Sequence, residues 1–219
     1  MSDSERHSHA SGAELISDPV LRAEREVQNG LKQFQTVVEM IQYHLDPERP
    51  FRFRPSQLQT LQRVALAGLD PYAGNWRPGG VEIHGSQHAP PEAFRVPELI
   101  EDLCDYINAK WNEKSPQHLA SYVMWKLNWI HPFTDGNGRT SRAASYLILN
   151  LRLGYLLPGK LTIPEQIAAN KRPYYDALEA ADEAWRAGKI DLTVMKDLLA
   201  AMLAKQLVAV HEDSQAGGE

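Results

Sequence analysis

The sequence lacks three features that would each indicate a class of protein: paired cysteines, a long apolar run and an excess of basic charge. Its single cysteine, Cys104, cannot form an internal disulfide, which suits a reducing compartment. No stretch approaches the roughly 18 consecutive apolar residues of a membrane span, and the polar first residues contain no signal-peptide core. With 23 Lys+Arg against 28 Asp+Glu, the formal charge of −5 does not attract nucleic acid or anionic lipid. We therefore expect a cytoplasmic protein with no nucleic-acid or membrane partner, unless a route that the sequence does not show delivers it elsewhere.

The remaining composition is that of an ordinary globular protein, with 43% hydrophobic and 23% charged residues among 219. This length predicts one domain. Residues 1–17, rich in Ser, His, Gly and acidic side chains, are expected to form a disordered leader, and residues 213–219 a polar tail. The single domain would then occupy residues 18–212 and open with a long N-terminal helix over 18–46, where apolar residues recur at helical spacing.

Helical periodicity dominates the rest of the domain. Prolines, glycines and the apolar pattern predict further helices over residues 56–68, 96–111, 115–130, 138–153, 174–187 and 191–210. The exception is a stretch in which residues 75–77 and 81–84 alternate on either side of the pair Gly79-Gly80, a pattern typical of a β-hairpin. The predicted fold class is all-α with one inserted β-hairpin.

The run HPFTDGNGRTSR, residues 131–142, is the most informative part of the sequence. Gly136 and Gly138 on either side of Asn137 allow positive φ angles, which turn successive backbone N–H groups inward into an anion-binding nest. A predicted helix starts directly after this nest, and its free N–H groups and dipole add to the attraction for phosphate. The run has no Gly-Lys-Ser/Thr ending and is therefore not a Walker A loop.

Four side chains beside the nest have chemistry that suits a phosphate site. Arg139 and Arg142 lie on one face of the predicted helix, where two guanidinium groups can bind phosphate oxygens. Asp135, an acid at the edge of such a site, indicates Mg²⁺, which binds through one or two carboxylates plus substrate phosphates. His131, with an ordinary pKa near ~6.5, suits a general base.

Each of these residues also has an ordinary structural interpretation. A Gly-Asn-Gly turn often only links two helices, arginines early in a helix are often solvated, and a lone histidine is more often structural than catalytic. The combination of a base, an acid, a nest and two arginines in one short run favours a phosphate-binding active site.

The same run resembles the signature of the Fic-domain family, His-x-Phe-x-(Asp/Glu)-Gly-Asn-Gly-Arg-x-x-Arg, at every fixed position. The resemblance extends over a core of about residues 55–200 and includes Gly74–Arg77, Pro90-Pro91 and Tyr174-Tyr175. It implies a Fic-type helical bundle in which the inserted hairpin is the family's flap. Most members of this family transfer AMP from ATP to a hydroxyl side chain of a target protein.

This resemblance implies a role for each residue of the motif. His131 would take the proton from a Ser, Thr or Tyr hydroxyl of the target, which attacks the α-phosphorus of ATP. Asp135 would hold the Mg²⁺, and Phe133 would point into the core. The phosphates would bind to Gly136, Asn137, Gly138, Arg139 and Arg142.

Two further regions take roles by the same resemblance. Val81 and Ile83 of the flap would dock the target, because an exposed strand edge accepts the backbone of an extended peptide. Tyr174 and Tyr175 would border the base and the ribose of the nucleotide.

Two departures from the family pattern leave the nucleotide and the control of activity open. Some members have Asn where this chain has Asp182, against the nucleotide, so a nucleotide other than ATP is an alternative. Many members carry a Ser/Thr-x-x-x-Glu helix whose Glu pairs with the second arginine, and no Ser or Thr of this chain has Glu four residues on. Glu24 or Glu26 could take that role in a degenerate form. Otherwise an antitoxin-like inhibitor or a homo-oligomer restrains the protein, or no restraint exists.

Three functions fit these observations. The first is a protein adenylyltransferase, an enzyme of the nucleotidyltransferase class. The second is a Fic relative that uses another nucleotide or phosphorylates its target, although the intact Gly136-Asn137-Gly138 disfavours phosphorylation. The third is a regulatory module that binds ATP without turnover. The sequence does not identify the target protein or the modified residue.

Overall fold

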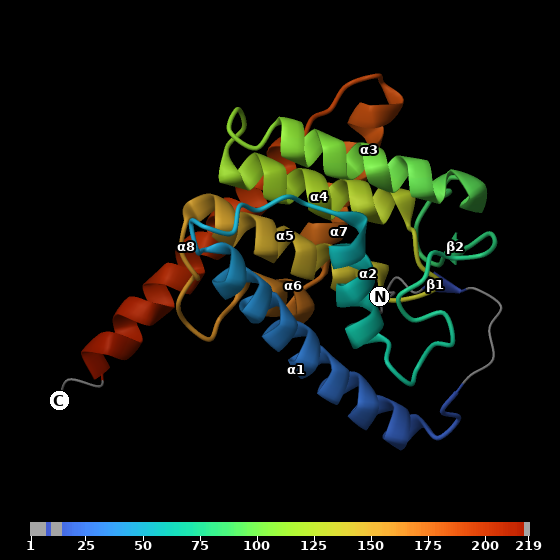
Figure 1. The fold of residues 1–219 in the computed structure, drawn as a ribbon, viewed down its shortest axis with the longest axis horizontal. Helices are drawn as coiled ribbons and strands as arrows, with labels where there is room; N and C mark the ends of the chain where they lie inside the picture. Colours follow the sequence, from blue (N-terminus) through green and yellow to red (C-terminus); the bar gives the residue numbers. More distant parts are fainter. Residues whose placement is uncertain (1–7, 10–14, 217–219) are drawn as a thin grey trace.

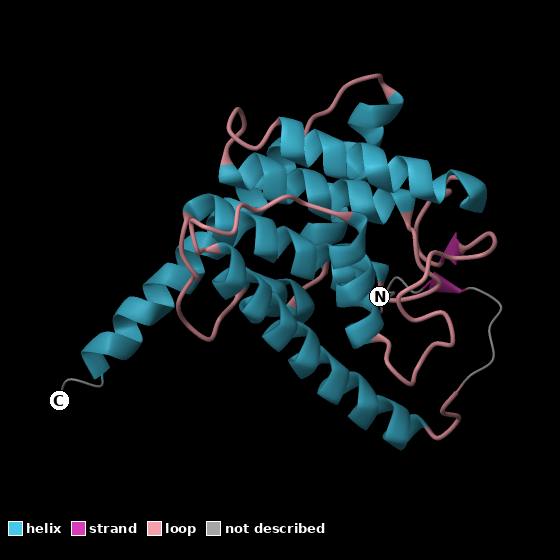
Figure 2. Ribbon diagram, viewed as in Figure 1, coloured by secondary structure: helices cyan, strands magenta, loops and turns pink. Residues whose placement is uncertain are grey.

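The computed structural model describes residues 8–9 and 15–216. Within this part the chain is mainly helical, with one pair of two-residue strands, so the predicted all-α class is confirmed (Figures 1 and 2). The helices are α1 (Pro19–His44), α2 (Pro55–Ala65), α3 (Val96–Ala109), α4 (Pro116–Ile130), α5 (Asn137–Leu153), α6 (Ile163–Ala169), α7 (Arg172–Arg186) and α8 (Thr193–Ala216). A short 3₁₀ helix, η1 (Ala93–Arg95), precedes α3, and the strands are β1 (Ser8–His9) and β2 (Glu82–Ile83).

Helices α4 and α5 form the centre of the bundle and pack mainly against each other. Helices α1 and α2 pack against α5, and helices α3, α7 and α8 pack against α4 (Figure 1). Every residue from Leu119 to Leu127 of α4 and from Ala143 to Asn150 of α5 is buried. The link between the two helices, residues 131–136, is therefore held at both ends by closely packed structure.

Local sequence signals determine the outer ends of these two helices. Ser115 accepts a hydrogen bond from the N–H of His118, and Pro116 occupies the first turn of α4, which together are typical of a helix start. Gly154, at φ 82°, ends α5 in the left-handed conformation that glycine adopts without strain.

Helix α1 is joined to α2 by buried amide side chains. Asn29 Nδ2 donates to the carbonyls of Ala65 and Ala67, at 3.2 and 2.9 Å, and Gln33 Nε2 donates to that of Leu61 at 3.1 Å. Ala65 and Ala67 lie at and beyond the end of α2, where carbonyls have no donor within the helix. These bonds satisfy the end of α2 and fix its position relative to α1.

The described residues contain a single strand pair, as expected for an inserted flap, but the partner of β2 differs from the predicted one. Residues 75–77 form no strand, and β2 pairs antiparallel with β1, with Ser8 opposite Ile83 (Figure 2). The backbone N–H of Arg77 donates to the carbonyl of Pro132 at 2.8 Å. This segment is therefore bonded to the link after α4 and does not form a hairpin with β2.

The structure describes part of the leader over residues 1–17, for which the sequence predicts disorder. Ser8 and His9 form β1. Ile16 packs against a small apolar cluster at and beyond the end of α2, formed by Ala65, Leu66 and Leu69. The prediction for residues 1–7 and 10–14 lies outside the described residues.

Two helices differ from the predicted pattern. The predicted helices do not include α6, although Thr162 and Glu165 form a capping box, which is a helix-start signal visible in the sequence. Helix α8 continues to Ala216 through most of the predicted polar tail, and residues 217–219 lie outside the described part. Neither α8 nor any other helix in the described ranges is long and apolar enough to cross a membrane.

Replacing Asn29 by Ala tests the junction between α1 and α2. The change leaves the buried carbonyl of Ala65 and the more exposed carbonyl of Ala67 without their donor, so we expect it to lower the free energy of unfolding by about 1–3 kcal/mol. Gln35→Ala on the exposed face of α1 is the matched control and should stay within about 0.5 kcal/mol of wild type. Urea unfolding measures both, and equal midpoints for the two variants would contradict the proposed junction.

Candidate active site

His131 is the residue at which α4 ends. Its backbone is left-handed, with φ 51° and ψ 58°, and its N–H donates to the carbonyl of Leu127 at 2.9 Å. A non-glycine residue in this conformation is held there by its surroundings. The imidazole Nδ1 lies 3.2 Å from the carbonyl oxygen of Asn128 and donates to it, because a carbonyl can only accept. The neutral ring therefore carries its lone pair on Nε2, as a general base requires.

Burial lowers the pKa of His131. The residue is 5% exposed, and desolvation lowers the pKa from 6.5 to about 4. The hydrogen bond to Asn128 opposes this shift, while His88 and Arg77 lower the pKa further. At neutral pH the imidazole is therefore uncharged, and the same burial disfavours its protonated form.

Two hydrogen bonds close the link between α4 and α5 into a turn. Asn137 Oδ1 accepts from the N–H of Phe133, and Asn137 Nδ2 donates to the carbonyl of Phe133, both at 2.9 Å. Phe133 is fully buried, with its ring centroid 5.0 Å from that of Trp76, so its expected position in the core is confirmed. The Asn137 side chain is used within the protein to shape the turn, which leaves its backbone N–H for a phosphate.

Gly136 and Gly138 allow close contacts that a side chain would block. Gly136 has φ 77°, and a Cβ there would lie 2.3 Å from Leu66 Cδ2. A Cβ on Gly138 would lie 3.2 Å from the guanidinium of Arg142. Helix α5 starts at Asn137, and the N–H groups of its first turn have no acceptor within the helix. The structure thus has the left-handed glycine and the helix N-terminus that an anion-binding nest requires.

Arg139 and Arg142 differ in their partners. Arg139 Nη2 pairs with Asp135 Oδ2 at 3.2 Å, and Asp135 Oδ1 accepts from the N–H of Gly136 at 2.6 Å. No carboxylate of the described residues lies within ion-pair distance of Arg142. The positive charge of Arg142, next to Gly138, is therefore not neutralised by a neighbouring acid in the described part of the chain.

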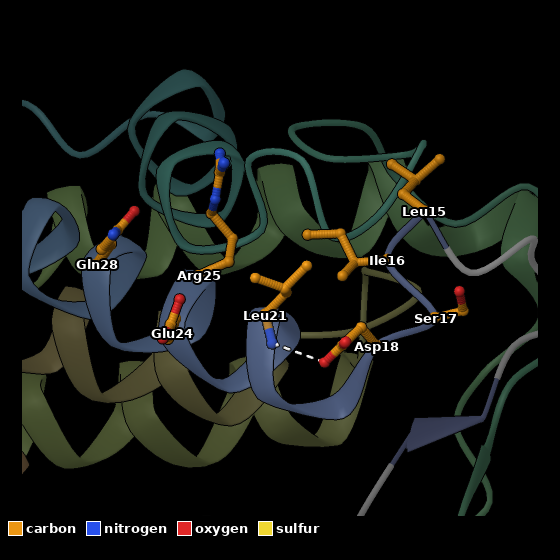
Figure 3. Close-up of a pocket in the computed structure, with 8 residues that line it drawn as sticks. All are labelled: Leu15, Ile16, Ser17, Asp18, Leu21, Glu24, Arg25 and Gln28. Atoms are coloured by element: carbon orange, nitrogen blue, oxygen red, sulfur yellow. Dashed lines mark hydrogen bonds between the residues drawn. The ribbon is translucent and has the colours of Figure 1, made fainter.

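Glu24 and Glu26, the two acidic residues considered for the inhibitory role, have neighbours other than Arg142. Glu26 pairs with Arg22 on α1 at 3.4 Å. Glu24 lines a cavity at the start of α1, beside Leu21 and Arg25 (Figure 3). Neither residue forms an ion pair with Arg142, so the degenerate inhibitory role suggested for them has no support in the described contacts.

Arg77 joins the flap to His131, a role that sequence analysis missed. The residue is 3% exposed. Its Nε donates to the carbonyl of His131 at 2.8 Å and its Nη1 to that of Gly79 at 2.7 Å, while Nη2 donates to that of Pro91. One buried guanidinium thus connects both ends of the flap, residues 79–91, with the turn that carries the candidate base.

The flap itself has the side-chain alternation of a strand. Val81 and Ile83, the predicted docking residues, are half-buried, and the residues that alternate with them are exposed. Beyond the strand, His88 Nε2 donates to the carbonyl of Trp129 at 2.7 Å. The flap is therefore attached near His131 on both sides, through Arg77 and through His88.

Tyr174 and Tyr175, predicted to lie at the base and the ribose, open α7. Tyr174 is 1% exposed, and its hydroxyl accepts from Asn128 Nδ2 at 2.8 Å and lies 3.2 Å from Ser141 Oγ. It therefore joins α7 to α4 and α5. The Tyr175 ring is half-buried, 5.7 Å from that of Tyr174. A contact of either residue with a nucleotide stays a prediction.

A buried lysine between α4 and α7 was not found from the sequence. Lys126 is 5% exposed, and its Nζ lies 3.8 Å from the ring centroid of Trp129 and 4.1 Å from that of Trp185. Burial lowers its pKa to about 8, against the opposite effect of nearby acids that include Asp182. Asp182 Oδ1 also accepts from Trp125 Nε1 at 2.8 Å. The residue that departs from the family pattern is thus part of a charged and aromatic cluster.

Asp135 is suited to a magnesium ion that is completed by phosphates. The described residues contain no group of three or more His, Cys, Asp or Glu side chains that could hold a metal on their own. The Asp135 side chain is 38% exposed at the edge of the turn. One accessible carboxylate beside an anion site matches the preference of Mg²⁺ for few protein ligands plus phosphate and water.

Comparison with known proteins agrees with the fold. Residues 52–149 match the model of the Fic/DOC family. A protein adenylyltransferase Fic from Drosophila willistoni is 34% identical over 125 residues, which cover 56% of this chain and 23% of that protein. The solved structure of Fic-1 from C. elegans has a TM-score of 0.67 at 24% identity and covers 92% of this chain and 55% of its own. The N-terminal Fic domain of a Bartonella quintana protein, with bound ADP, has a TM-score of 0.57 at 21% identity, over 84% of this chain and 85% of its own.

The fold and the site define a helical protein with a glycine-containing turn between its two central helices, a turn suited to an anion. Residues 52–149 match the Fic/DOC family, and the predicted family resemblance is confirmed over that segment. It spans only 23% of the length of the Drosophila relative.

Substitution of Gly136 by Ala tests the close approach of the turn to Leu66. We expect a loss of stability roughly 1–3 kcal/mol larger than that of Gly154→Ala, because overpacking adds to the strain of a left-handed alanine. Gly154 is the matched control, since it has a similar φ of 82° and no atom within 4 Å of an added Cβ. Thermal or urea unfolding measures the difference. Equal losses in the two variants would show that Leu66 does not restrict the turn.

The titration of His131 tests its burial. Because desolvation opposes the charged form, we expect its imidazole to titrate near pH 4 and to remain neutral from pH 6 to 8. NMR of the ring carbon or proton signals, assigned with His131→Ala, measures the value. A midpoint between pH 6 and 7 would contradict the buried environment.

Proposed function

We propose that this protein is a protein adenylyltransferase that transfers AMP from ATP to a Ser, Thr or Tyr hydroxyl of a target protein. The observation that carries the proposal is the arrangement of one turn. A buried, neutral His131 precedes the N-terminus of α5. The basic Arg142 on α5 has no carboxylate partner among the described residues. The relative named protein adenylyltransferase, 34% identical over 125 residues, supports this type of reaction.

His131 is the general base in this proposal. Its Nε2 takes the proton of the target hydroxyl as the hydroxyl oxygen attacks the α-phosphorus of ATP. A new O–P bond forms, the bond from the α-phosphorus to the oxygen that bridges to the β-phosphorus breaks, and pyrophosphate leaves. The carbonyl of Asn128, which accepts from Nδ1, stabilises the imidazolium that results. Arg77 acts as a positioning residue through its bond to the carbonyl of His131.

The phosphates bind in the turn and at the start of α5. The backbone N–H groups of Gly136, Asn137 and Gly138 and the guanidinium of Arg142 face the leaving group in this proposal, and Arg139 joins them. Asp135 holds Mg²⁺, which when bound offsets the charge of the phosphates. Transfer of this kind depends mainly on positioning and charge neutralisation, and these residues supply both.

The flap docks the target. In this proposal, Ile83 of β2 and Val81, which directly precedes β2, form an extended segment whose backbone pairs with a segment of the target protein. The attachment of the flap through Arg77 and His88 keeps such a segment close to His131.

Asp182 favours a second candidate function, transfer from a nucleotide other than ATP. An aspartate can only accept hydrogen bonds, whereas an asparagine both donates and accepts, so the exchange changes which base edge fits. A phosphorylating reaction and ATP binding without turnover compete with both candidates. Because no described acid neutralises Arg142, a restraint that acts at Arg142 would come from a separate antitoxin-like protein or from a homo-oligomer, or does not exist.

Labelled nucleotides separate these functions. The full chain is incubated with Mg²⁺, a cell lysate as the source of targets, and ATP labelled at either the α- or the γ-phosphate. We expect the α-label, and not the γ-label, to enter protein, because AMP is the group transferred. The γ-label in protein would indicate phosphorylation, and binding without label would indicate a regulatory module. Parallel reactions with α-labelled GTP, CTP and UTP test the effect of Asp182.

The control for this experiment is His131→Ala. Loss of the base should reduce labelling by at least about 100-fold, the usual contribution of general base catalysis, while ATP still binds. Undiminished labelling by this variant would show that His131 is not the base.

A further inference from the structure

One edge of β2 already has an occupant in this protein. Strand β1, from the N-terminal leader, pairs antiparallel with β2 in the register Ser8 opposite Ile83 and His9 opposite Glu82 (Figure 2). Strand β2 is the element that our proposed function assigns to target docking. A segment of the chain itself therefore makes the kind of backbone contact that a target would make there.

The position of β2 places this contact beside the candidate active site. The chain is attached to the catalytic turn before β2, where Arg77 bonds to the carbonyls of His131 and Pro132. It is attached again after β2, where His88 bonds to the carbonyl of Trp129. Strand β2 thus lies on a short loop that starts and ends next to His131. A segment that pairs with β2 is therefore held close to His131.

The leader is also anchored at its other end. Ile16 packs against the cluster that contains Leu66, and Leu66 lies directly against Gly136 of the phosphate-binding turn. Asp18 then caps α1 by accepting from the N–H groups of Val20 and Leu21. Only six residues separate Ile16 from His9, so the leader connects the turn to the flap by a short tether.

We propose that the leader segment Ser8–His9 occupies the target's place on β2, so that a target protein has to displace it before AMP transfer. The part of this inference that concerns a target protein rests on the proposed function. The pairing of β1 with β2 does not depend on it.

The size of the effect follows from the tether. A short tether presents its segment at an effective concentration of roughly millimolar, well above that of a cellular protein target. A strand pair of two residues is weak by itself, and the tether compensates for this weakness. If the leader is paired for at least half of the time, removing the pair should lower the apparent KM for a target by at least about twofold. The maximal rate should not change, because the catalytic turn is untouched.

The test uses the full chain with a double substitution, S8P/H9P. Proline has no backbone N–H and cannot donate a hydrogen bond to a neighbouring strand. The double change therefore disrupts the hydrogen bonding between β1 and β2, whether Ser8 or His9 is the residue that donates. Ala13→Pro, in the same leader but outside β1, is the matched control. The first measurement is amide hydrogen exchange at Glu82 and Ile83 by NMR, where the one N–H of the two that points toward β1 reports the pairing. We expect faster exchange in S8P/H9P than in wild type, and no change in Ala13→Pro.

The second measurement is the transfer of α-label from ATP to lysate proteins over a series of lysate concentrations. We expect S8P/H9P to label at least about twofold more at low lysate concentration and equally at high concentration, with Ala13→Pro like wild type. Unchanged amide exchange, or faster exchange with unchanged labelling at low concentration, would overturn the inference. Labelling by wild type with no difference between variants overturns only this inference, whereas no α-label from any variant overturns the proposed function.

Discussion

The double hydrogen bond between the Asn137 side chain and the Phe133 backbone is the constraint on which the rest of the site depends. It closes the link between the two central helices into one turn. That turn ends α4 at a left-handed His131 and starts α5 after a left-handed Gly136. A base and a helix N-terminus are thereby fixed within one short segment, between helices that are buried on nearly all sides.

The charges of the site follow from this arrangement. Burial keeps His131 neutral, so the candidate base does not add to the positive charge of the two arginines beside it. Asp135 neutralises Arg139, while no described acid neutralises Arg142. The turn therefore has a net attraction for an anion, and the accessible Asp135 carboxylate can hold a cation that arrives with the anion if it gives up its pairing with Arg139. This combination is what a magnesium-bound nucleoside triphosphate requires.

Much of the helical fold and the main site were predictable from sequence because their signals are local. Helical periodicity located α4 and α5, and the glycines and arginines of residues 131–142 located the turn that is the candidate anion site. Contacts between distant segments were not predictable in this way. Nothing local indicates that Arg77 bonds to His131, that Lys126 lies among tryptophans, or that β2 pairs with the leader. Each of these depends on residues that are brought together only by packing of the bundle.

The most direct test of this account is a crystal structure of the protein with Mg²⁺ and an ATP analogue that cannot be cleaved between the α- and β-phosphates. The account predicts phosphate oxygens within hydrogen-bond distance of the N–H groups of residues 136–138 and of the Arg142 guanidinium. It also predicts that Nε2 of His131 faces the α-phosphorus. A bound analogue whose phosphates lie away from this turn would contradict the account.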